Sequence, residues 1–190
     1  NKHKIVKGED IEFAIKQKIN RMNLVEEHIF AAIKSGAYLI SLSGLRVGQA
    51  NGLSVQYVGE YCLGLPGRIT SLASVSKNEI IDIERTSKLS GKIHTKGLLI
   101  LASILKSFFT QKTTKGFSIS ICFEQSYSEI DGDSAMAAEL SAAISAASGI
   151  PIKQNFATTG SLNQLGDIQP VGGINEKIEG FYNIAKLLKK

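Results

Sequence analysis

The first part of the chain places its apolar side chains at a helical spacing. Residues Glu9–Arg21 carry isoleucine at positions 11, 15 and 19, and Asn23–Lys34 continues with apolar residues three or four apart. Side chains at that spacing lie on one face of an α-helix, and Gly36 is a residue type that commonly follows a helix end. We therefore predict two short amphipathic helices in residues 1–36, which would form a helical connector to the rest of the chain.

From residue 37 onward the spacing changes to one that favours strands. Leu53–Val58 alternates apolar and polar side chains, as a strand with one buried face does. Tyr38–Leu42 is a short run of β-type composition. Further strands are predicted at Arg68–Val75, Glu79–Glu84, Phe117–Phe123, Asn155–Thr158 and Gln164–Val171, with a turn at Ser76–Asn78.

Three later segments are predicted to be helices. Gly97–Phe109 is apolar on nearly all sides, which indicates a helix buried on most of its faces. Ser134–Ser148 is rich in alanine and is followed by Gly149, and Ile174–Leu188 is the last helical segment. Strands and helices mixed in this order predict an α/β or α+β domain in residues 37–190.

The composition is that of a soluble globular protein with one main domain. Of the 190 residues, 43% are hydrophobic and 21% are charged. The longest apolar run, Gly97–Leu105, is too short to cross a bilayer, and no secretory signal opens the chain, so we expect a cytoplasmic protein with no membrane partner. The first residue is not Met and the last helix runs to the chain end, from which we expect a fragment of a longer protein.

Charge and cysteine content narrow the chemistry. The net charge is +5, but the positive residues are spread out apart from small clusters at the two ends, which weighs against a nucleic-acid partner. Cys62 and Cys122 lie far apart in apolar stretches and are expected to be buried, reduced thiols. Neither they nor the three histidines have the spacing of metal ligands, so no metal and no cofactor is expected in this chain.

A serine in a short polar segment is the first candidate for chemistry. Ser134 lies in Asp131-Gly132-Asp133-Ser134-Ala135, after a predicted strand and at the start of a predicted helix. Unpaired N–H groups and a partial positive charge at a helix start suit the oxyanion of an acyl-transfer intermediate, and Gly132 permits a sharp turn. Because Ser and Asp are also favoured N-cap residues, helix capping is the alternative explanation.

A lysine in the last predicted helix is the second candidate. Lys177 follows Gly172-Gly173, which ends a strand and opens the helix. A cation is disfavoured at that end of a helix, and an apolar wall would lower the lysine pKa further, so the amine could act as a general base. The neighbouring Glu176 and Glu179 favour the alternative of a solvated surface lysine. The hydroxyl of Thr159, at a predicted strand end, could hold such an amine in place, although strand threonines commonly have no such role.

These candidates lie in segments that resemble the proteolytic domain of the Lon family of ATP-dependent proteases (endopeptidase La). The box Asp131–Leu140 resembles the family's nucleophile motif, and Thr158–Gly166 with Gln169–Gly180 resembles its base motif. The Asp-Gly-Asp-Ser form is more similar to the B-type branch than to the A-type. Upstream, Val47–Leu53 and Leu89–Gly97 also resemble that branch, so the likeness covers most of the chain.

The resemblance implies a serine endopeptidase with a Ser–Lys dyad. Ser134 would be the nucleophile, Lys177 the general base, and Thr159 the residue whose hydroxyl orients the lysine. Two acidic positions match family residues that can contact the lysine in a resting arrangement, and main-chain N–H groups at the serine would hold the oxyanion. These supporting positions are Asp131, Asp133, Gly132 and Ala135.

The resemblance also implies an architecture and partners. The family's fold is an α/β unit like ribosomal protein S5 domain 2, and its members form hexameric rings that degrade unfolded or regulatory proteins with the help of an AAA+ module. This chain has no Gly-x-x-x-x-Gly-Lys-Ser/Thr loop, so ATP and Mg are expected on that module elsewhere in the full-length protein. Residues 1–36 would then be the end of the AAA+ lid, and residues 37–190 a proteolytic domain truncated at its C-terminus.

Two other functions stay open at this point. A family member without peptidase activity could act as a scaffold. A basic chain of S5-like fold could also be an RNA-binding module, because that fold hosts RNA-binding proteins. Against RNA binding, the chain has no tryptophan and no interleaving of aromatic and basic residues.

Overall fold

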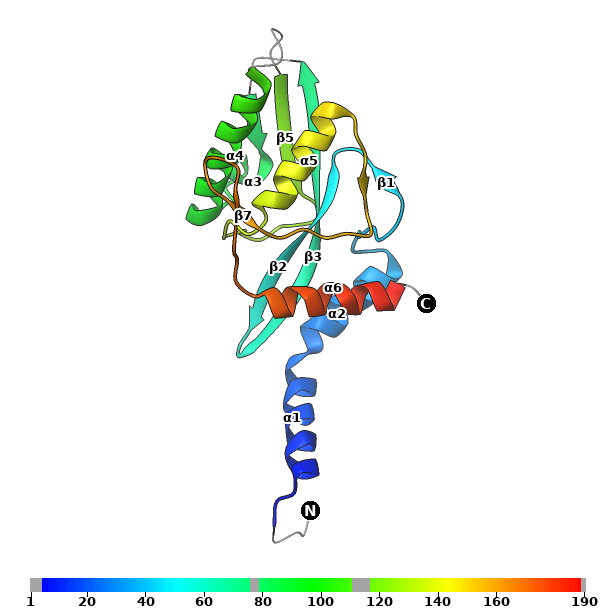
Figure 1. Ribbon diagram of the computed structural model, residues 1–190. Coiled ribbons are helices and arrows are strands. Elements are labelled where there is room, and N and C mark those ends of the chain that lie inside the picture. Colours follow the sequence, from blue (N-terminus) through cyan, green and yellow to red (C-terminus); the bar gives the residue numbers. More distant parts are fainter. Residues whose placement is uncertain (1–4, 76–78, 111–116, 189–190) are drawn as a thin grey trace.

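Helices and strands are mixed along the chain and combine into an α+β fold (Figure 1). The structure is a computed structural model that describes residues 5–75, 79–110 and 117–188, so the turn predicted at Ser76–Asn78 lies outside the described residues. In chain order the elements are α1 (Gly8–Met22), α2 (Leu24–Ser35), β1 (Leu45–Arg46), β2 (Gln49–Val58), β3 (Tyr61–Val75), β4 (Glu79–Asp82), α3 (Ile83–Thr86), α4 (Lys92–Thr110), β5 (Phe117–Phe123), α5 (Met136–Ser148), β6 (Ile152–Lys153), β7 (Ser161–Leu162), β8 (Ile168–Gln169) and α6 (Ile174–Leu188).

A four-stranded sheet in the order β2-β3-β5-β4 forms the frame of the fold. β2 and β3 form a long antiparallel hairpin, and β5 pairs with β3 in antiparallel and with β4 in parallel orientation. Ile69 of β3 shows the register, because it lies opposite Ala50 of β2 and Phe123 of β5. The hairpin extends beyond the other strands, and α6 crosses this extension (Figure 1).

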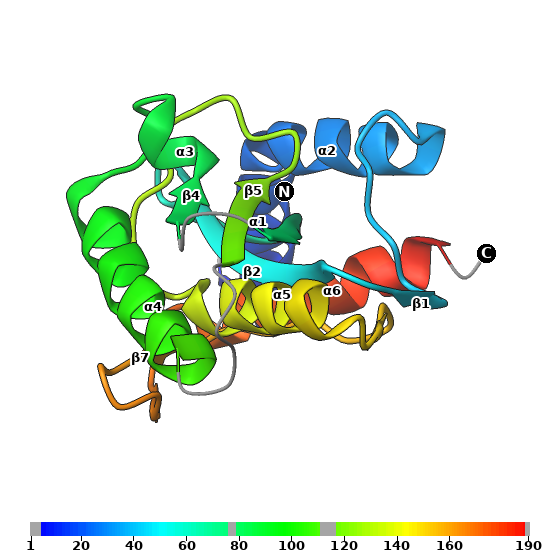
Figure 2. The same ribbon diagram turned by 90° about the horizontal axis from the view of Figure 1, so that it is seen from above.

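Helices α4 and α5 pack side by side against one face of the sheet (Figures 1 and 2). Burial of apolar side chains between these layers is the main contribution to their stability. The side chains that are fully buried there are Ile69, Leu101, Leu105, Ile119 and Ile121. α5 contributes alanines to the same core, which allow its backbone to approach the sheet closely: Ala138, Ala142 and Ala143.

The crossing of α6 over the hairpin is a contact that only glycine permits. A Cβ atom on Gly180 of α6 would overlap the carbonyl oxygen of Gly64 in β3, and a Cβ atom on Gly64 would overlap the carbonyl oxygen of Glu176. Helix and strand backbones therefore touch directly. This contact determines where the first turn of α6 lies, and with it the position of Lys177.

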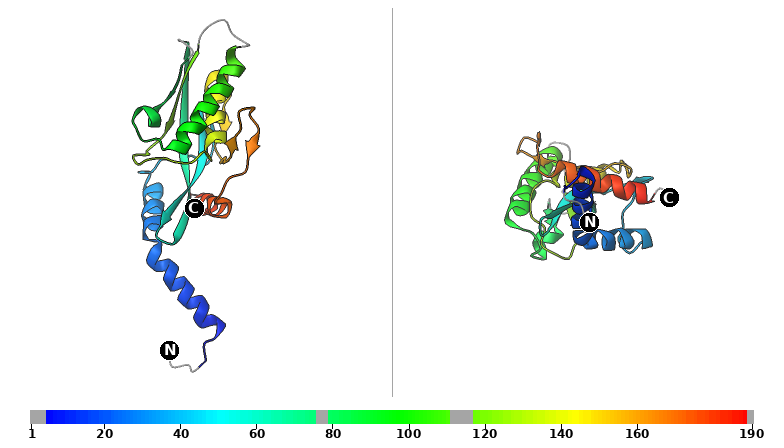
Figure 3. Two further views of the ribbon diagram at one scale, coloured as in Figure 1. Left: turned by 90° about the vertical axis from the view of Figure 1, so that its left-hand side faces the viewer. Right: turned by 90° about the horizontal axis from the view of Figure 1, so that it is seen from below.

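The first helix, α1, extends away from the rest of the molecule (Figure 3). None of its residues is buried, and its isoleucines at positions 11, 15 and 19 are exposed. α2 lies against the body, where Ile33 is buried and Glu26 accepts a hydrogen bond from the Tyr61 hydroxyl at 2.6 Å. No described helix is long and apolar enough to cross a membrane.

Most of the predicted elements are confirmed. β5 and α6 have the predicted bounds, and α1 and α2 agree with prediction to within one residue at each end. Gly36 ends α2 in the left-handed conformation, with φ of 79°. α5 begins at Met136, slightly later than predicted, and β2 and β3 begin earlier. The predicted α+β class is therefore correct.

The strand predicted at Tyr38–Leu42 is wrong, because this segment is irregular. Its polar groups form single hydrogen bonds and not the main-chain pairing of a strand. The Tyr38 hydroxyl donates to the carbonyl oxygen of Pro66 at 3.1 Å, and the Leu39 N–H donates to the side-chain oxygen of Gln125 at 2.6 Å. The β-type composition of the run reflects partial burial against the body.

The strand predicted at Asn155–Thr158 is wrong, and the one predicted at Gln164–Val171 is shorter than expected. Within Asn155–Thr158 only an isolated bridge from Thr158 to Gly52 forms. Within Gln164–Val171 only β8 is paired, with β7. The side chain of Asn163 accepts hydrogen bonds from two main-chain N–H groups further along and closes a turn there, which removes residues from the strand.

The strand predicted at Glu79–Glu84 ends earlier than expected, at Asp82. Glu84 lies in α3, because the Asp82 carboxylate accepts a hydrogen bond from the Arg85 N–H at 2.8 Å and caps that helix. Cys62 and Cys122 are free thiols as predicted, but both are half-buried rather than buried.

Candidate active site

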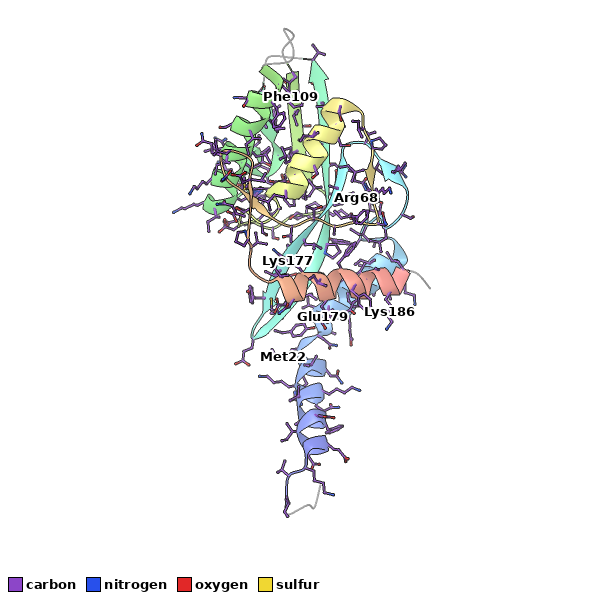
Figure 4. All side chains as sticks on the ribbon, in the orientation of Figure 1. Met22, Arg68, Phe109, Lys177, Glu179 and Lys186 are labelled. Carbon is purple, nitrogen blue, oxygen red and sulfur yellow. The ribbon has the colours of Figure 1, made fainter. Side chains whose placement is uncertain are left out.

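Lys177 is in the first turn of α6, the helix that follows β8 (Figure 4). Only 2% of its surface is exposed, and it is the largest side chain among those that are fully buried. The alternative of a solvated surface lysine is therefore wrong. Glu179, which favoured that alternative, is exposed on the same helix.

The Thr159 hydroxyl connects Lys177 to Ser134. Lys177 Nζ donates a hydrogen bond to Thr159 Oγ1 at 3.1 Å, and Thr159 Oγ1 donates to the main-chain carbonyl oxygen of Ser134, also at 3.1 Å. Among the described residues no direct hydrogen bond joins Ser134 Oγ to Lys177 Nζ. The amine and the serine residue are thus held on two sides of a single hydroxyl.

The surroundings of Lys177 favour its neutral form. Burial lowers the pKa of the amine below its ordinary value, and the negative charge of Asp133 partly opposes that shift. Burial has this effect because an ammonium group loses its hydration when it leaves water. A neutral amine can accept a proton, as a general base must.

The segment that carries Thr159 is hydrogen-bonded to the start of α5. The Gly160 N–H donates to the carbonyl oxygen of Ser134 at 2.8 Å, and the Ala137 N–H donates to the carbonyl oxygen of Gly160 at 3.0 Å. A Cβ atom on Gly160 would lie 3.3 Å from the Ala137 Cβ, so glycine allows this close approach. The pairing brings together Ser134 and Thr159, which lie 25 positions apart in the chain.

Asn51 of β2 anchors the preceding part of the same segment. Its side-chain amide donates to the carbonyl oxygens of Ser41 and Gln154 at 2.9 Å and of Phe156 at 3.2 Å. Its own carbonyl oxygen accepts from the Thr158 N–H at 2.8 Å. No local sequence pattern pointed to Asn51, because two of its side-chain partners lie more than a hundred positions away.

Ser134 lies immediately before the N-cap of α5 and lines a pocket of about 120 Å³. The N–H groups of Ser134 and of the N-cap residue, Ala135, have no hydrogen-bond partner within the described parts of the chain. They are therefore available to an acceptor in the pocket. The other residues around the pocket are mostly small or apolar, among them Gly52, Leu53, Gly67, Phe123, Ile130 and Ala135.

Capping does not explain the polar residues before α5. The helix has no side-chain hydrogen bond at its N-cap. Asp133 contributes only its main-chain oxygen, which accepts from the Met136 N–H at 3.2 Å. In residues 117–188, neither the Asp133 nor the Ser134 side chain accepts a hydrogen bond from a main-chain N–H. The alternative of capping is therefore wrong.

Asp131 fixes the loop before Ser134 to the start of α4. Its Oδ1 accepts hydrogen bonds from the main-chain N–H groups of Ile93 and His94, at 3.0 and 3.3 Å. Main-chain hydrogen bonds, the strongest from Gly132, hold the pKa of its carboxyl below the usual range. This cap explains why α4 begins earlier than predicted. Gly132 itself has φ of 94°, in the left-handed region that favours glycine.

The two acids of this loop differ in their relation to the lysine. Across the described residues neither Asp131 nor Asp133 forms an ion pair with Lys177. Asp133 acts on the amine through its charge, whereas Asp131 has its hydrogen bonds at α4. The resting contact between these acids and the lysine stays a prediction.

A serine at a helix start and a buried lysine near it are typical of hydrolases that use a Ser–Lys dyad. The model of the Lon protease (S16) C-terminal proteolytic domain family matches residues 45–184. The chain therefore belongs to that family.

Curated proteins that are similar to most of this chain are also named as Lon proteases or Lon protease homologs. A protein of Escherichia coli (strain K12) named "Putative Lon protease homolog" is 43% identical over 181 residues, which is 94% of this chain and 31% of that protein. A protein of the same name from Haemophilus influenzae is 40% identical over 93% of this chain and 30% of its own length. An "Archaeal Lon protease" of Archaeoglobus fulgidus is 33% identical over 74% of this chain and 22% of its own length. The chain thus spans about a third or less of the relatives it matches.

Proposed function

We propose that the chain is the peptidase unit of a Lon-type serine protease, in which Ser134 is the nucleophile and Lys177 the general base. The observation that carries this proposal is the buried amine of Lys177, which the Thr159 hydroxyl joins to the serine residue. A lysine is expensive to bury without a partner of opposite charge. In a catalytic base that same burial serves a purpose, because it lowers the pKa of the amine and so favours the neutral form.

The reaction would proceed in two halves. Ser134 Oγ attacks the carbonyl carbon of a peptide bond while its proton passes to the neutral amine of Lys177, and the oxyanion accepts hydrogen bonds from the N–H groups of Ser134 and Ala135. The ammonium group of Lys177 then gives its proton to the leaving amine as the C–N bond breaks. In the second half, a water molecule loses a proton to Lys177 and attacks the ester carbon. Lys177 then gives this proton to Ser134 Oγ as the ester C–O bond breaks, which releases the carboxylic acid and restores the serine hydroxyl and the neutral amine.

Thr159 has a supporting role in this scheme. Its hydroxyl accepts a hydrogen bond from the Lys177 amine and donates to a fixed main-chain oxygen, so it limits the positions that the amine can occupy. During the reaction, rotation about the side-chain bonds of Lys177 would move the amine from the Thr159 hydroxyl to Ser134 Oγ. The apolar walls that Leu53, Phe123 and Ile130 give the pocket suit an apolar side chain of the substrate.

The remaining parts of the proposal follow from the family. The substrates would be unfolded or regulatory proteins, delivered by an ATP-dependent module of the full-length protein, and the assembly would be a hexameric ring. No residue of this chain is assigned to ATP or Mg.

Cleavage of a fluorogenic peptide or of casein tests the dyad. We expect Ser134→Ala and Lys177→Ala each to lower kcat/KM at least about a thousandfold. Lys34→Ala, which changes an exposed lysine of α2, serves as the matched control and should cleave at the wild-type rate. Wild-type turnover in either dyad variant would contradict the proposal. A wild-type protein that neither cleaves peptides nor reacts with a fluorophosphonate would favour a noncatalytic scaffold instead.

A further inference from the structure

A cluster of buried titratable side chains lies behind the walls of the Ser134 pocket, and the proposed reaction uses none of them. His94 of α4 and Glu139 of α5 face each other, with 3.5 Å between Nε2 and Oε1, and only 3% and 2% of their side chains are exposed. Asp82 at the end of β4 and Glu84 of α3 are buried beside them. We call these four residues the acid–histidine cluster.

The members of this cluster lack full hydrogen-bonding partners. Among the described residues, one polar atom of each has none: Asp82 Oδ1, Glu84 Oε2, His94 Nε2 and Glu139 Oε1. In the part of the chain that the structure describes, no group of three histidine, cysteine or acidic side chains is placed to hold a metal ion. Unpaired buried charges are strongly unfavourable, so such a cluster is stable only if it retains protons.

The electrostatic surroundings agree with retained protons. Burial, reinforced by the charges of Asp82 and Glu84, raises the pKa of Glu139 to about 8. Burial and then the neighbouring carboxyl of Asp82 raise the pKa of Glu84 to about 7. Burial lowers the pKa of His94, although the charges of Asp82 and Asp131 partly oppose this. Near neutral pH the histidine is therefore neutral and Glu139 is protonated.

The thiol of Cys122 on β5 is, besides the Asp131 carboxylate, a titratable group that faces the cluster. Burial, followed by the charge of Glu84 and then of Glu124, raises its pKa to about 11, so it stays uncharged as the carboxyls ionise. The Phe123 N–H, which bonds to Glu84, partly offsets the charge of that carboxylate, but no cation contributes to the pKa shift of either glutamate.

Three of the four residues are joined to a residue that lines the pocket, Glu84 through its carboxylate and the other two through their main-chain N–H groups. The His94 N–H donates to Asp131 Oδ1 at 3.3 Å. Glu84 Oε1 accepts from the Phe123 N–H at 2.8 Å. Within α5, the main-chain N–H of Glu139 donates to the carbonyl oxygen of Ala135 at 3.0 Å. Asp131, Phe123 and Ala135 all line the pocket together with Ser134.

The rings of His94 and Phe123 form a second contact between the cluster and the pocket. His94 packs edge-on against Phe123, with ring centroids 5.4 Å apart and an angle of 63° between the ring planes. The imidazole therefore contacts one wall of the pocket directly, while the main-chain N–H of the same residue bonds to the loop that Asp131 fixes. Packed cores respond to shifts of a side chain in discrete steps rather than smoothly.

We propose that the acid–histidine cluster is a proton-holding element that positions the Ser134 pocket: its carboxyls repel one another once they lose their protons, and the pocket walls they anchor then separate. Glu139 and His94 are thus positioning residues for the peptidase reaction. Only the activity part of this inference rests on the proposed function, because the effect of protons on the fold can be measured separately.

The direction of the pH effect follows from the pKa shifts. A carboxyl whose pKa is raised by folding contributes stability that is fully present below its ordinary value of 4.5 and is lost as pH rises to the folded value. For Glu139 that loss is complete at about pH 8, and for Glu84 at about pH 7. His94 has the opposite sign, because its pKa is lowered, and it destabilises the fold only in acid. The carboxyls therefore dominate on the alkaline side.

The first test is thermal unfolding of Glu139→Gln, which keeps the shape of the side chain but cannot ionise. We expect the Tm of this variant minus that of the wild type to rise by at least about 2 °C between about pH 5.5 and about pH 8.5. Glu27→Gln, at an exposed glutamate of α2, is the matched control and should show no such rise. A Tm difference that stays constant with pH would overturn the proposal.

The second test is the rate at which a fluorophosphonate labels Ser134. We expect the labelling rate of Glu139→Gln divided by that of the wild type to increase severalfold between about pH 7 and about pH 9. The ratio removes the effect of Lys177 titration, which both proteins share. A ratio that does not change, with the expected Tm behaviour, would refute the positioning role.

The two tests separate this inference from the proposed function. A wild-type protein that is labelled at no pH would contradict the proposed function, while the Tm measurement would still decide whether the cluster holds protons. If Glu139→Gln did not fold, Glu84→Gln would replace it in the Tm measurement, with its rise complete at about pH 7.

Discussion

The amine of Lys177 donates a hydrogen bond to the hydroxyl of Thr159, and that hydroxyl donates in turn to the main-chain oxygen of Ser134. One threonine thus orients the proposed base relative to the residue that carries the proposed nucleophile. The three residues come from three separate segments: the residues just before α5, the loop before β7 and the first turn of α6. These hydrogen bonds predict how substitutions at the three residues affect catalysis.

Replacement of Thr159 by valine should slow catalysis without unfolding the protein. Valine has nearly the same shape but no hydroxyl, so the amine loses its acceptor and Ser134 loses one donor to its carbonyl oxygen. We expect kcat to fall about 10- to 100-fold, because a misplaced catalytic group has effects of that size. Steady-state peptide cleavage measures this. Thr159→Ser retains the hydroxyl and should recover most of the activity; equal activity in the serine and valine variants would show that the hydroxyl is unimportant.

The charge of Asp133 should affect the pH at which kcat/KM rises to half of its maximum. Activity requires the neutral amine, so kcat/KM should rise with pH as Lys177 loses its proton. Asp133 raises the pKa of Lys177, and Asp133→Asn should therefore move the midpoint of this rise to lower pH. Glu12→Gln, which removes an exposed acid of α1, should leave the midpoint where it is. A shift to higher pH in Asp133→Asn would contradict the assignment of Lys177 as the base.

Sequence patterns could predict those parts of the molecule that depend on local spacing. The bounds of α6 followed from its periodicity, and the positions of Ser134 and Lys177 followed from two motifs that each occupy one continuous segment. Glycines such as Gly36 and Gly132 could be placed because a single residue type suits a positive φ. Each of these inferences needs only residues that are neighbours in the chain.

Contacts between distant segments could not be predicted in the same way. Tyr38–Leu42 has the composition of a strand, but its partners are single side-chain and main-chain atoms that no local pattern reveals. The role of Asn51 depends on carbonyl groups about a hundred positions away. The pairing of His94 with Glu139 was also missed, although a glutamate within an alanine-rich helix was a signal that could have drawn attention to it.

The contact between α6 and the hairpin predicts a large effect from a single methyl group. In Gly180→Ala the new Cβ would overlap the backbone of Gly64, and two backbones cannot give way as a flexible side chain does. We expect a loss of about 2 kcal/mol or more in the free energy of unfolding, which corresponds to a fall in Tm of about 4 °C or more. Activity should fall as well, since the shift displaces Lys177.

The matched control for this change is Gly8→Ala in α1. Gly8 is also a helical glycine, but a Cβ atom there has nothing within 4 Å, so the substitution should be neutral or slightly stabilising through its higher helix propensity. If Gly180→Ala were as stable as Gly8→Ala, α6 would not be seated on β3 as described.

Asn51 should control the position of Thr159 from a distance. Asn51→Asp keeps the size of the side chain but, near neutral pH, places a negative charge opposite the carbonyl oxygens of Ser41, Gln154 and Phe156. Loss of these donated hydrogen bonds and the added repulsion should destabilise the fold by about 1–3 kcal/mol or more. The segment that leads to Thr159 would then be less firmly held.

Hydrogen exchange resolves this effect from general destabilisation. The Thr158 N–H bonds to the carbonyl oxygen of Asn51, so we expect its exchange to accelerate more in Asn51→Asp than exchange at core amides such as that of Ile119. Asn20→Asp, at an exposed position of α1, provides the control for an added charge. Kinetics should show a lower kcat, because Thr159 no longer fixes the amine. Uniform acceleration at both amides would mean that Asn51 supports the whole domain and has no specific influence on the candidate site.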